Sequence, residues 1–309
     1  MNSSTIVVVG STNTDMVIKA SHLPQPGETI LGGTFFMSAG GKGANQAVAA
    51  ARLGGSVLFI AKTGYDIFAK QSIDLFEKEG IDISGIQRDH YQPSGVALIT
   101  VDDDGENCIV VAPGANAALS PSDIDEVKDK IENASLLLAQ LETPIETVEH
   151  VANIAASAKI KFILNPAPAA KLADELLTKV SIITPNQTEA EMLTGIQVTD
   201  GSSARQAANF LHSKGIETVI ITMGAAGAFV LHEDKYSMIP GHKVNVVDTT
   251  AAGDVFNGAL LVALSEGAGM DDAVIFACSA AAISVTRLGA QASAPTRAEV
   301  ESFVHANAK

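Results

Sequence analysis

The sequence has no tryptophan, only two cysteines, few aromatic residues and little positive charge. Two cysteines cannot form the disulfide framework of a small secreted domain, and they favour a reducing compartment. Lysine and arginine total 20 against 35 aspartates and glutamates, giving a formal charge of −15, which argues against general binding to nucleic acid or to an anionic membrane surface. A secretion signal is not recognisable, and no apolar run is long enough to span a bilayer. We therefore expect a cytoplasmic protein whose partners include neither nucleic acid nor membrane.

The chain has 309 residues, 47% of them hydrophobic, which is enough to bury a large core. Short apolar runs typical of buried strands occur at 6–9, 57–61, 136–141, 162–164, 182–184 and 219–222. Segments of helical composition occur at 44–53, 67–79, 253–265, 271–286 and from Arg297 onward. Their alternation predicts an α/β fold, with a mostly parallel central sheet flanked by helices on both faces. We expect one domain over residues 1–309.

Two insertions, at about 14–38 and 94–111, interrupt this alternation. In the first, strand-like segments at 16–19 and 29–37 flank the turn-rich Pro24-Gln25-Pro26-Gly27. In the second, segments at 95–101 and 108–112 flank Asp102-Asp103-Asp104-Gly105, a good hairpin turn. The insertions predict a small β-sheet that projects from the main body.

The segment 248–258 is a turn of small residues that opens into a helix, with Asp254 in the first turn. The unpaired N–H groups at a helix start bind anions, and Gly253 lets a ligand approach the backbone closely. An acid beside such a site suits a base that takes a proton from a hydroxyl attacking a bound phosphoryl group. The alternative is that Asp254 simply caps the helix.

Two polar segments near the N-terminus are candidates for a hydroxylated ligand. Asn13 and Asp15 follow the first strand and suit hydrogen bonds to vicinal hydroxyls, although both residue types are also common in ordinary turns. Gly40-Gly41-Lys42-Gly43-Ala44 places a lysine among glycines at a helix start. This is not a Walker A loop, because the spacing is wrong and Ala44 replaces the required Ser or Thr.

Glu142 follows the strand at 136–141, and Thr143 with Glu146 fits a capping box for the next helix. Because that box does not use Glu142, its carboxylate is free to face a ligand.

Asn186 and Glu189 fit either a helix cap or a pair that orders water around Mg²⁺. The glycines of the segment 222–227 suit a turn over phosphates or adenine, although a lone G-x-x-G is weak evidence. The seven histidines lack zinc spacing, and no G-x-S-x-G elbow supports a serine hydrolase.

Together and in this order, these motifs resemble the ribokinase (PfkB) family of carbohydrate kinases over essentially the whole chain. The two signatures are Gly40-Gly41-Lys42-Gly43-Ala44-Asn45-Gln46-Ala47 and Asp248-Thr249-Thr250-Ala251-Ala252-Gly253-Asp254, and the segments 114–120 and 165–169 are also similar. The resemblance implies ATP-dependent phosphorylation of the 5-hydroxyl of D-ribose, giving D-ribose 5-phosphate and ADP. It also identifies the insertions as the family lid, whose edges pair between the two subunits of a homodimer.

The resemblance assigns roles to individual residues. It makes Asp254 the general base, and it places the anion hole at the N–H groups of Ala251, Ala252, Gly253 and Asp254. The ribose-binding residues would be Asn13, Asp15, Gly41, Lys42, Asn45, Glu142 and Asp254. The nucleotide site would be lined by Asn186, Thr222, Gly224, Gly227, Gly253 and Cys278. Glu189 would help place Mg²⁺ through water, and an activating K⁺ would lie in a cage of Asp248, Thr250, Ser284, Arg287, Gly289 and Ser293.

Two departures from the family pattern concern residues beside the site. Val255 stands where a threonine commonly follows the catalytic aspartate, and Cys278 stands where bacterial relatives can carry histidine. Neither change removes a group that the chemistry needs. The alternatives are a 2-deoxyribokinase or related sugar kinase of the same family, and a non-catalytic sugar-binding regulator. A binder has no use for a base at the anion hole, and Asn13 with Asp15 favours a sugar that has both ring hydroxyls.

Overall fold

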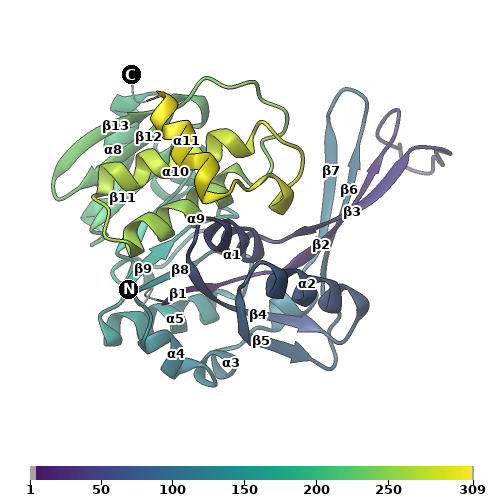
Figure 1. The fold of residues 1–309 in the computed structure, drawn as a ribbon, viewed down its shortest axis with the longest axis horizontal. Coiled ribbons are helices and arrows are strands. Elements are labelled where there is room, and N and C mark those ends of the chain that lie inside the picture. The colour runs from purple at the N-terminus through teal and green to yellow at the C-terminus, as the bar shows by residue number, and fades with distance from the viewer. Residues whose placement is uncertain (1–4, 308–309) are drawn as a thin grey trace.

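A computed structural model describes residues 5–307, and its main sheet has nine strands in the order β13-β12-β11-β10-β9-β8-β1-β4-β5 (Figure 1). The seven strands from β11 to β5 pair in parallel, whereas β12 and β13 add antiparallel at one edge. The strands are β1 (Thr5–Val9), β4 (Ser56–Gly64), β5 (Asp82–Asp89), β8 (Leu136–Ala139), β9 (Lys161–Leu164), β10 (Ile182–Ile183), β11 (Thr218–Thr222), β12 (Gly227–His232) and β13 (Lys235–Pro240).

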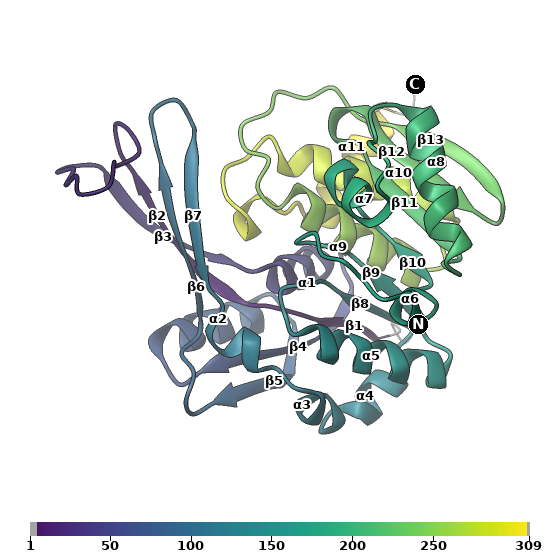
Figure 2. The ribbon, with the colours of Figure 1, turned by 180° about the vertical axis from the view of Figure 1, so that it is seen from behind.

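Helices cover both faces of this sheet, because alternate residues of each buried strand point to opposite sides. In β1, Ile6 and Val8 join one core cluster, and Val7 and Val9 join the other. Figures 1 and 2 show α9, α10 and α11 on one side and α3, α4 and α5 on the other. The α-helices are α1 (Lys42–Arg52), α2 (Ile67–Lys78), α3 (Pro121–Asp125), α4 (Lys128–Glu132), α5 (Ile145–Ala158), α6 (Asp174–Leu177), α7 (Gln187–Thr194), α8 (Gly201–Ser213), α9 (Ala252–Ser265), α10 (Met270–Ser284) and α11 (Arg297–Asn307). The short 3₁₀ helices are η1 (Gly114–Ala118), η2 (Gly224–Ala226) and η3 (Gln291–Ser293).

A separate four-stranded sheet, in the order β3-β2-β6-β7, projects from the main body (Figures 1 and 2). Its strands are β2 (Asn13–Lys19), β3 (Thr34–Gly40), β6 (Gly95–Val101) and β7 (Asn107–Ala112). The two inner strands run parallel, starting at Asn13 opposite Gly95, and each outer strand pairs antiparallel. All six residues of β7 are exposed.

The predicted α/β class, the parallel sheet and the small projecting sheet are confirmed. Four local predictions were wrong. Residues 29–33 are not strand, since β3 begins at Thr34, and Asn13 and Asp15 lie in strand β2 rather than in a loop. The capping box at Thr143 does not form: Pro144 is the N-cap residue of α5, and the buried Thr143 hydroxyl has no hydrogen-bond partner among the described residues. The strand predicted to end at 141 already ends at Ala139, which places Glu142 three residues beyond it.

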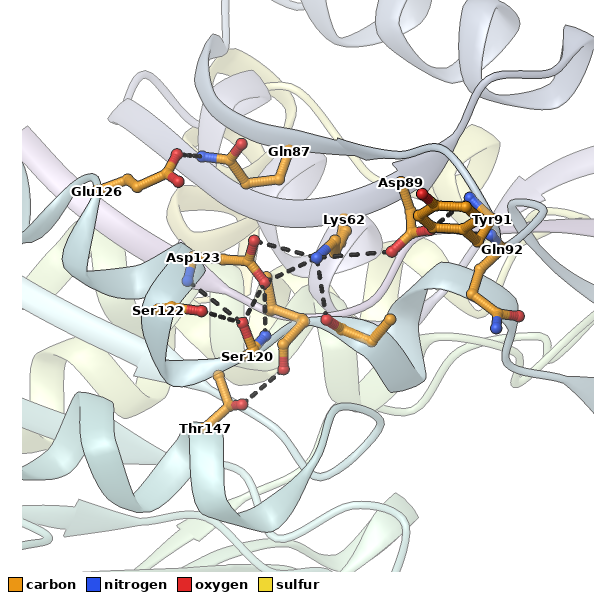
Figure 3. Close-up of polar contacts among 12 residues, drawn as sticks. Lys62, Gln87, Asp89, Tyr91, Gln92, Ser120, Ser122, Asp123, Glu126 and Thr147 are labelled. Carbon is orange, nitrogen blue, oxygen red and sulfur yellow. Dashed lines mark hydrogen bonds and ion pairs between the residues drawn. The ribbon is translucent and has the colours of Figure 1, made fainter.

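Partly buried ion pairs centred on Lys62 of β4 attach η1 and α3 to the main sheet (Figure 3). Its Nζ lies 2.9 and 3.0 Å from the carboxylate oxygens of Asp123, 3.6 Å from Asp89 and 3.1 Å from the carbonyl oxygen of Ala118. Ala118 is the last residue of η1, so this lysine fixes one end of that short helix.

No helix within residues 5–307 is long and apolar enough to cross a membrane.

Candidate active site

The start of α9 has the geometry expected of an anion-binding turn. Ala251, the N-cap residue, has a φ of 60°, which is uncommon for a residue with a Cβ and marks a constrained backbone. The N–H of Ala252 bonds to the carbonyl oxygen of Thr249 at 3.2 Å. In the chain from residue 5 to 307, the N–H groups of Ala251, Gly253 and Asp254 have no acceptor. Three of the four expected anion-hole amides are therefore free to bind a negatively charged group.

The carboxylate of Asp254 is buried against the start of α1. Its Oδ2 accepts a hydrogen bond from Asn45 Nδ2 at 2.9 Å, and its Oδ1 accepts one from Gln46 Nε2 at 3.0 Å. The two helices touch closely at Gly258, where an added Cβ would lie 2.7 Å from the carbonyl oxygen of Gln46. Burial raises the pKa of Asp254, while the charge of Lys42 and the two amide hydrogen bonds lower it. The site thus holds a basic carboxylate in a fixed orientation.

Two adjoining cavities lie at this helix start. The smaller, about 170 Å³, has mainly polar walls that include Lys42, Glu189 and Asp254. The larger, about 780 Å³, has mainly apolar walls that include Phe256, Cys278 and Val246. Five residues line both cavities: Asn186, Thr222, Thr249, Ala252 and Gly253. The arrangement suits a ligand with a flat apolar group in the larger cavity and a charged group at the turn.

The residues expected around the nucleotide come from the carboxyl ends of β10 and β11, from the start of β12 and from the helices α9 and α10. Asn186 and Thr222 form an isolated bridge, and Gly224, Gly227 and Cys278 line the larger cavity. Burial raises the pKa of Cys278 to about 12, so its thiol stays neutral. His242 was not anticipated from the sequence: it also lines this cavity, its Nε2 lies 2.9 Å from Ser279 Oγ, and burial lowers its pKa. It lies in the irregular segment that follows β13, where no motif gave a signal.

Asn186 and Glu189 form the capping box that was one of the two interpretations of this pair. The Asn186 side chain accepts from the N–H of Glu189, and the Glu189 carboxylate accepts from the N–H of Asn186, each at 2.8 Å. Burial raises the pKa of Glu189, and Glu189 also lines the smaller cavity. One carboxylate oxygen therefore caps α7, which leaves the other available to a ligand.

The residues expected to bind the sugar meet where β2 leaves the main body. The carboxylate of Glu142 accepts from the N–H of Lys42 at 3.0 Å and from the hydroxyl of Ser11. Burial, and then the nearby charge of Glu142, raise the pKa of Asp15 to about 6. Gly41 has a φ of 88°, and a Cβ there would lie 2.8 Å from the backbone nitrogen of Asn13. The glycine therefore permits β2 and the start of α1 to touch.

Two further polar groups complete this region. The Oδ1 atom of Asn45 is buried and has no hydrogen-bond partner within residues 5–307. Asn116 of η1 donates from Nδ2 to Asn13 Oδ1 at 2.7 Å and to the carbonyl oxygen of Thr12 at 3.1 Å. Asn116 belongs to a segment that resembles the family, but the sequence gave no reason to assign it a role.

The residues expected to bind a monovalent cation lie just before α9, at the end of α10 and in the segment after α10 that contains η3. The Asp248 carboxylate accepts from the N–H groups of Thr250 and Gly289, both at 2.9 Å. Burial raises the pKa of Asp248, but these hydrogen bonds outweigh burial and leave the pKa below its usual value. The Arg287 side chain turns to Glu299, so only its backbone is available to an ion. The hydroxyls of Ser284 and Ser293 bond to the carbonyl oxygens of Ala281 and Ala290.

Comparison with known proteins matches this chain to one family and to well-described relatives. The model of the pfkB family carbohydrate kinases matches residues 3–297. Ribokinase of Haemophilus influenzae is 49% identical over 97% of this chain and 98% of its own. Deoxyribokinase of Salmonella typhi is 38% identical over 98% of this chain and 99% of its own. The solved structure of Arabidopsis thaliana ribokinase complexed with ribose and ATP has a TM-score of 0.93 at 31% identity, covering 98% of this chain and 99% of that one.

Proposed function

Because the chain belongs to the pfkB family of carbohydrate kinases, we propose that it transfers the γ-phosphoryl group of ATP to the 5-hydroxyl of D-ribose. The products are D-ribose 5-phosphate and ADP. The observation that carries this function is the buried Asp254 carboxylate beside three free backbone N–H groups at the start of α9. A base and an anion site at one point are what phosphoryl transfer to a hydroxyl requires.

Each part of the site has a role in this reaction. Asp254 takes the proton of the attacking hydroxyl, and the N–H groups of Ala251, Gly253 and Asp254 stabilise the charge on the transferring phosphoryl group. Lys42 lines the same small cavity and offsets the negative charge of a strongly acidic protein. Adenine occupies the larger cavity beside Cys278 and His242.

The sugar lies between β2 and the start of α1. Asn13, Asp15, Gly41, Lys42, Asn45 and Glu142 surround it. Asn13 and Asp15 favour a sugar with both ring hydroxyls, since a missing hydroxyl would leave a buried polar group unpaired. The unpaired polar group would therefore make deoxyribose a poorer substrate than ribose. Deoxyribose remains the second candidate substrate, because a 38% identical relative is a deoxyribokinase.

Two metal ions fit the residues present. Mg²⁺ would be held through water by Glu189, which lines the polar cavity and has one carboxylate oxygen outside the capping box, and it would neutralise phosphate charge. K⁺ would be held by oxygens of the loops that Asp248 joins: Asp248, Thr250, Ser284, Arg287, Gly289 and Ser293. These loops flank the anion-binding turn, so the ion would stiffen it. Equal rates in potassium and sodium salts would remove this assignment.

The four-stranded sheet acts as a lid over the sugar and as the interface of a homodimer. Its outer strand β7 is exposed along its whole length, and Ile109, Val110 and Val111 are at least half exposed. An apolar edge of this kind favours pairing with a second copy. Val110→Lys should shift the protein to a monomer in sedimentation, whereas Thr100→Lys on the inner strand β6 should matter less.

The two unpaired cysteines suit a cytoplasmic location.

The function is tested by measuring ADP formation on a panel of sugars with ATP, Mg²⁺ and K⁺. We expect the highest kcat/KM with D-ribose and a lower value with 2-deoxy-D-ribose. A higher value with deoxyribose would identify a deoxyribokinase. If no sugar stimulated ADP formation while ribose still bound, the protein would be a sugar-binding regulator.

A further inference from the structure

Gln46 of α1 binds one oxygen of the Asp254 carboxylate but lines neither cavity. Its Nε2 lies 3.0 Å from Oδ1, and its side chain is completely buried. Asn45, the preceding residue, binds the other oxygen, Oδ2. The two oxygens of the base are thus each bound by one amide, and the surroundings of these two amides differ.

The orientation of the Gln46 amide is fixed by a series of hydrogen bonds that begins at a backbone carbonyl. The carbonyl oxygen of Thr184 can only accept, so the atom of Asn165 that faces it at 3.2 Å is Nδ2. Asn165 Oδ1 therefore faces Gln46 at 3.0 Å and needs a donor, which must be Nε2. Oε1 of Gln46 accepts from Gln140 at 2.6 Å. If the Gln46 amide turned over, its Oε1 would face the acceptor oxygens of both Asn165 and Asp254.

The Asn45 amide is not fixed in this way. Its Oδ1 is buried without a partner among residues 5–307, so no protein group on that side determines which way the amide faces. A protonated carboxyl oxygen must donate, and an N–H group cannot accept. A proton is therefore disfavoured on Oδ1, which always faces the N–H of Gln46, and is tolerated on Oδ2. We propose that Gln46 is a positioning residue that makes Oδ2 the oxygen of Asp254 that takes the substrate proton.

This inference rests on the proposed function, the transfer of the γ-phosphoryl group to the sugar hydroxyl. The hydroxyl oxygen forms a bond to the γ-phosphorus while its proton passes to Oδ2 of Asp254. The bond between that phosphorus and the bridging oxygen breaks, and its electron pair leaves with ADP. The charged groups around Asp254 are Lys42 of α1, Glu142 after β8 and Glu189 of α7. Gln46 is neutral and acts through its fixed orientation.

The test is the pH dependence of kcat in Gln46→Met, which keeps the length of the side chain and removes both N–H donors. We expect kcat to fall about tenfold to a hundredfold because the carboxylate is less well positioned, with KM for ribose little changed. We expect the acidic limb of the profile to move up by about one pH unit, because the ionised carboxylate loses a donor. A wild-type kcat and acidic limb in this variant would overturn the proposal. Thr147→Val is the control, since it removes a buried hydrogen bond to the Leu119 carbonyl oxygen away from this site.

A measurement that does not need activity separates this inference from the proposed function. In protein labelled with ¹³C at the aspartate carboxyl carbons, the Asp254 signal is identified by its loss in Asp254→Ala. It should titrate at higher pH in Gln46→Met than in the unmodified protein, and coincident titrations would refute the role of Gln46. If the unmodified protein formed no ADP with any sugar, the proposed function would fail while this titration still decided the inference.

A further measurement uses the unmodified protein and tests the proposal even if Gln46→Met does not fold. In the unmodified protein, the two side-chain N–H hydrogens of Gln46 should exchange slowly with solvent, because one bonds to Asp254 and the other to Asn165. Exchange as fast as that of an exposed glutamine would overturn the proposal.

Discussion

Asn116 donates a hydrogen bond to Oδ1 of Asn13 over 2.7 Å, which leaves Nδ2 of Asn13 as the atom available to a ligand. The Asn116 side chain also accepts a hydrogen bond, at its Oδ1, from the N–H of Thr12 at 3.0 Å. A residue of η1, more than 100 positions along the chain, thus sets which atom of Asn13 can meet a sugar hydroxyl.

Replacing Asn116 should therefore weaken sugar binding more than turnover. In Asn116→Ala we expect KM for ribose to rise about tenfold, which corresponds to the loss of a hydrogen bond or two at about 1 kcal/mol each, with kcat nearly unchanged. Steady-state kinetics measures both. Asn133→Ala is the control, since its exposed amide bonds to the carbonyl oxygen of Asp129, away from the sugar site. A loss confined to kcat would contradict this role.

Removing the carboxylate of Asp254 should abolish turnover and preserve much of the binding. We expect Asp254→Ala to lower kcat by about 10²–10⁴-fold, the usual contribution of general base catalysis, while calorimetry still detects ribose. Asp271→Ala removes an exposed acid from the first turn of the next helix, α10, and should leave kcat unchanged. The structure already excludes the alternative that Asp254 caps α9, because Ala251 is the N-cap residue and no side chain among the described residues caps the helix. Near-normal turnover in Asp254→Ala would contradict its role as the general base.

Sugar binding should depend on the protonation of Asp15, whose pKa is raised to about 6. Below that pH the carboxyl is neutral and loses its capacity to accept two hydrogen bonds, so we expect the affinity for ribose to fall as the pH drops from about 7 to 5. Calorimetric titration with ribose at several pH values measures this. In Asp15→Asn the affinity should be lower and much less dependent on pH. An unchanged pH dependence in this variant would show that another group is responsible.

The same shift of the Asp15 pKa affects folding stability in a defined direction. Because the folded pKa lies above the unfolded value of 3.8, the folded state binds the proton more tightly, and its stability falls as the pH rises from about 4 to 6. Asp15→Asn should remove part of this decline, measured as the free energy of unfolding in urea.

Breaking the ion pairs around Lys62 should destabilise the protein markedly. Lys62 and Asp123 are each only 13–14% exposed, so Lys62→Met leaves a largely buried carboxylate without its cation, at a cost of about 2 kcal/mol, between those of exposed and fully buried pairs. Lys128→Met is the matched control, because its pair with Glu132 is exposed and should contribute under about 0.5 kcal/mol. Urea unfolding of both variants tests this. Equal effects would show that the cluster in Figure 3 contributes little stability.

The sequence predicted those elements that are determined by residues close together in the chain. Apolar runs identified the parallel strands, because strands covered on both faces are apolar throughout. The small residues before Asp254 indicated the anion-binding turn, since a helix start with little side-chain bulk exposes its N–H groups. The structure brings Asp254, Lys42 and Asn45 together as the resemblance implied.

What the sequence missed depends on contacts between distant segments. The hairpin of β12 and β13 closes one edge of the sheet through pairing, with no strong turn signal of its own. The bonds from Gln46 to Asp254 and from Asn116 to Asn13 join residues 208 and 103 positions apart. The capping box at Thr143 failed because Pro144, with an extended backbone, takes the N-cap position itself.

Strand β2 begins at Asn13, beside the sugar site, and continues without interruption to Lys19 on the projecting sheet, in step with β6 throughout. In the proposed function, a sugar hydroxyl bound by Asn13 and Asp15 would therefore hold the base of the projecting sheet. We expect sugar binding and the position of this sheet to be coupled, because β2 belongs to both. A sugar that does not bond to Asn13 and Asp15 would lack this coupling.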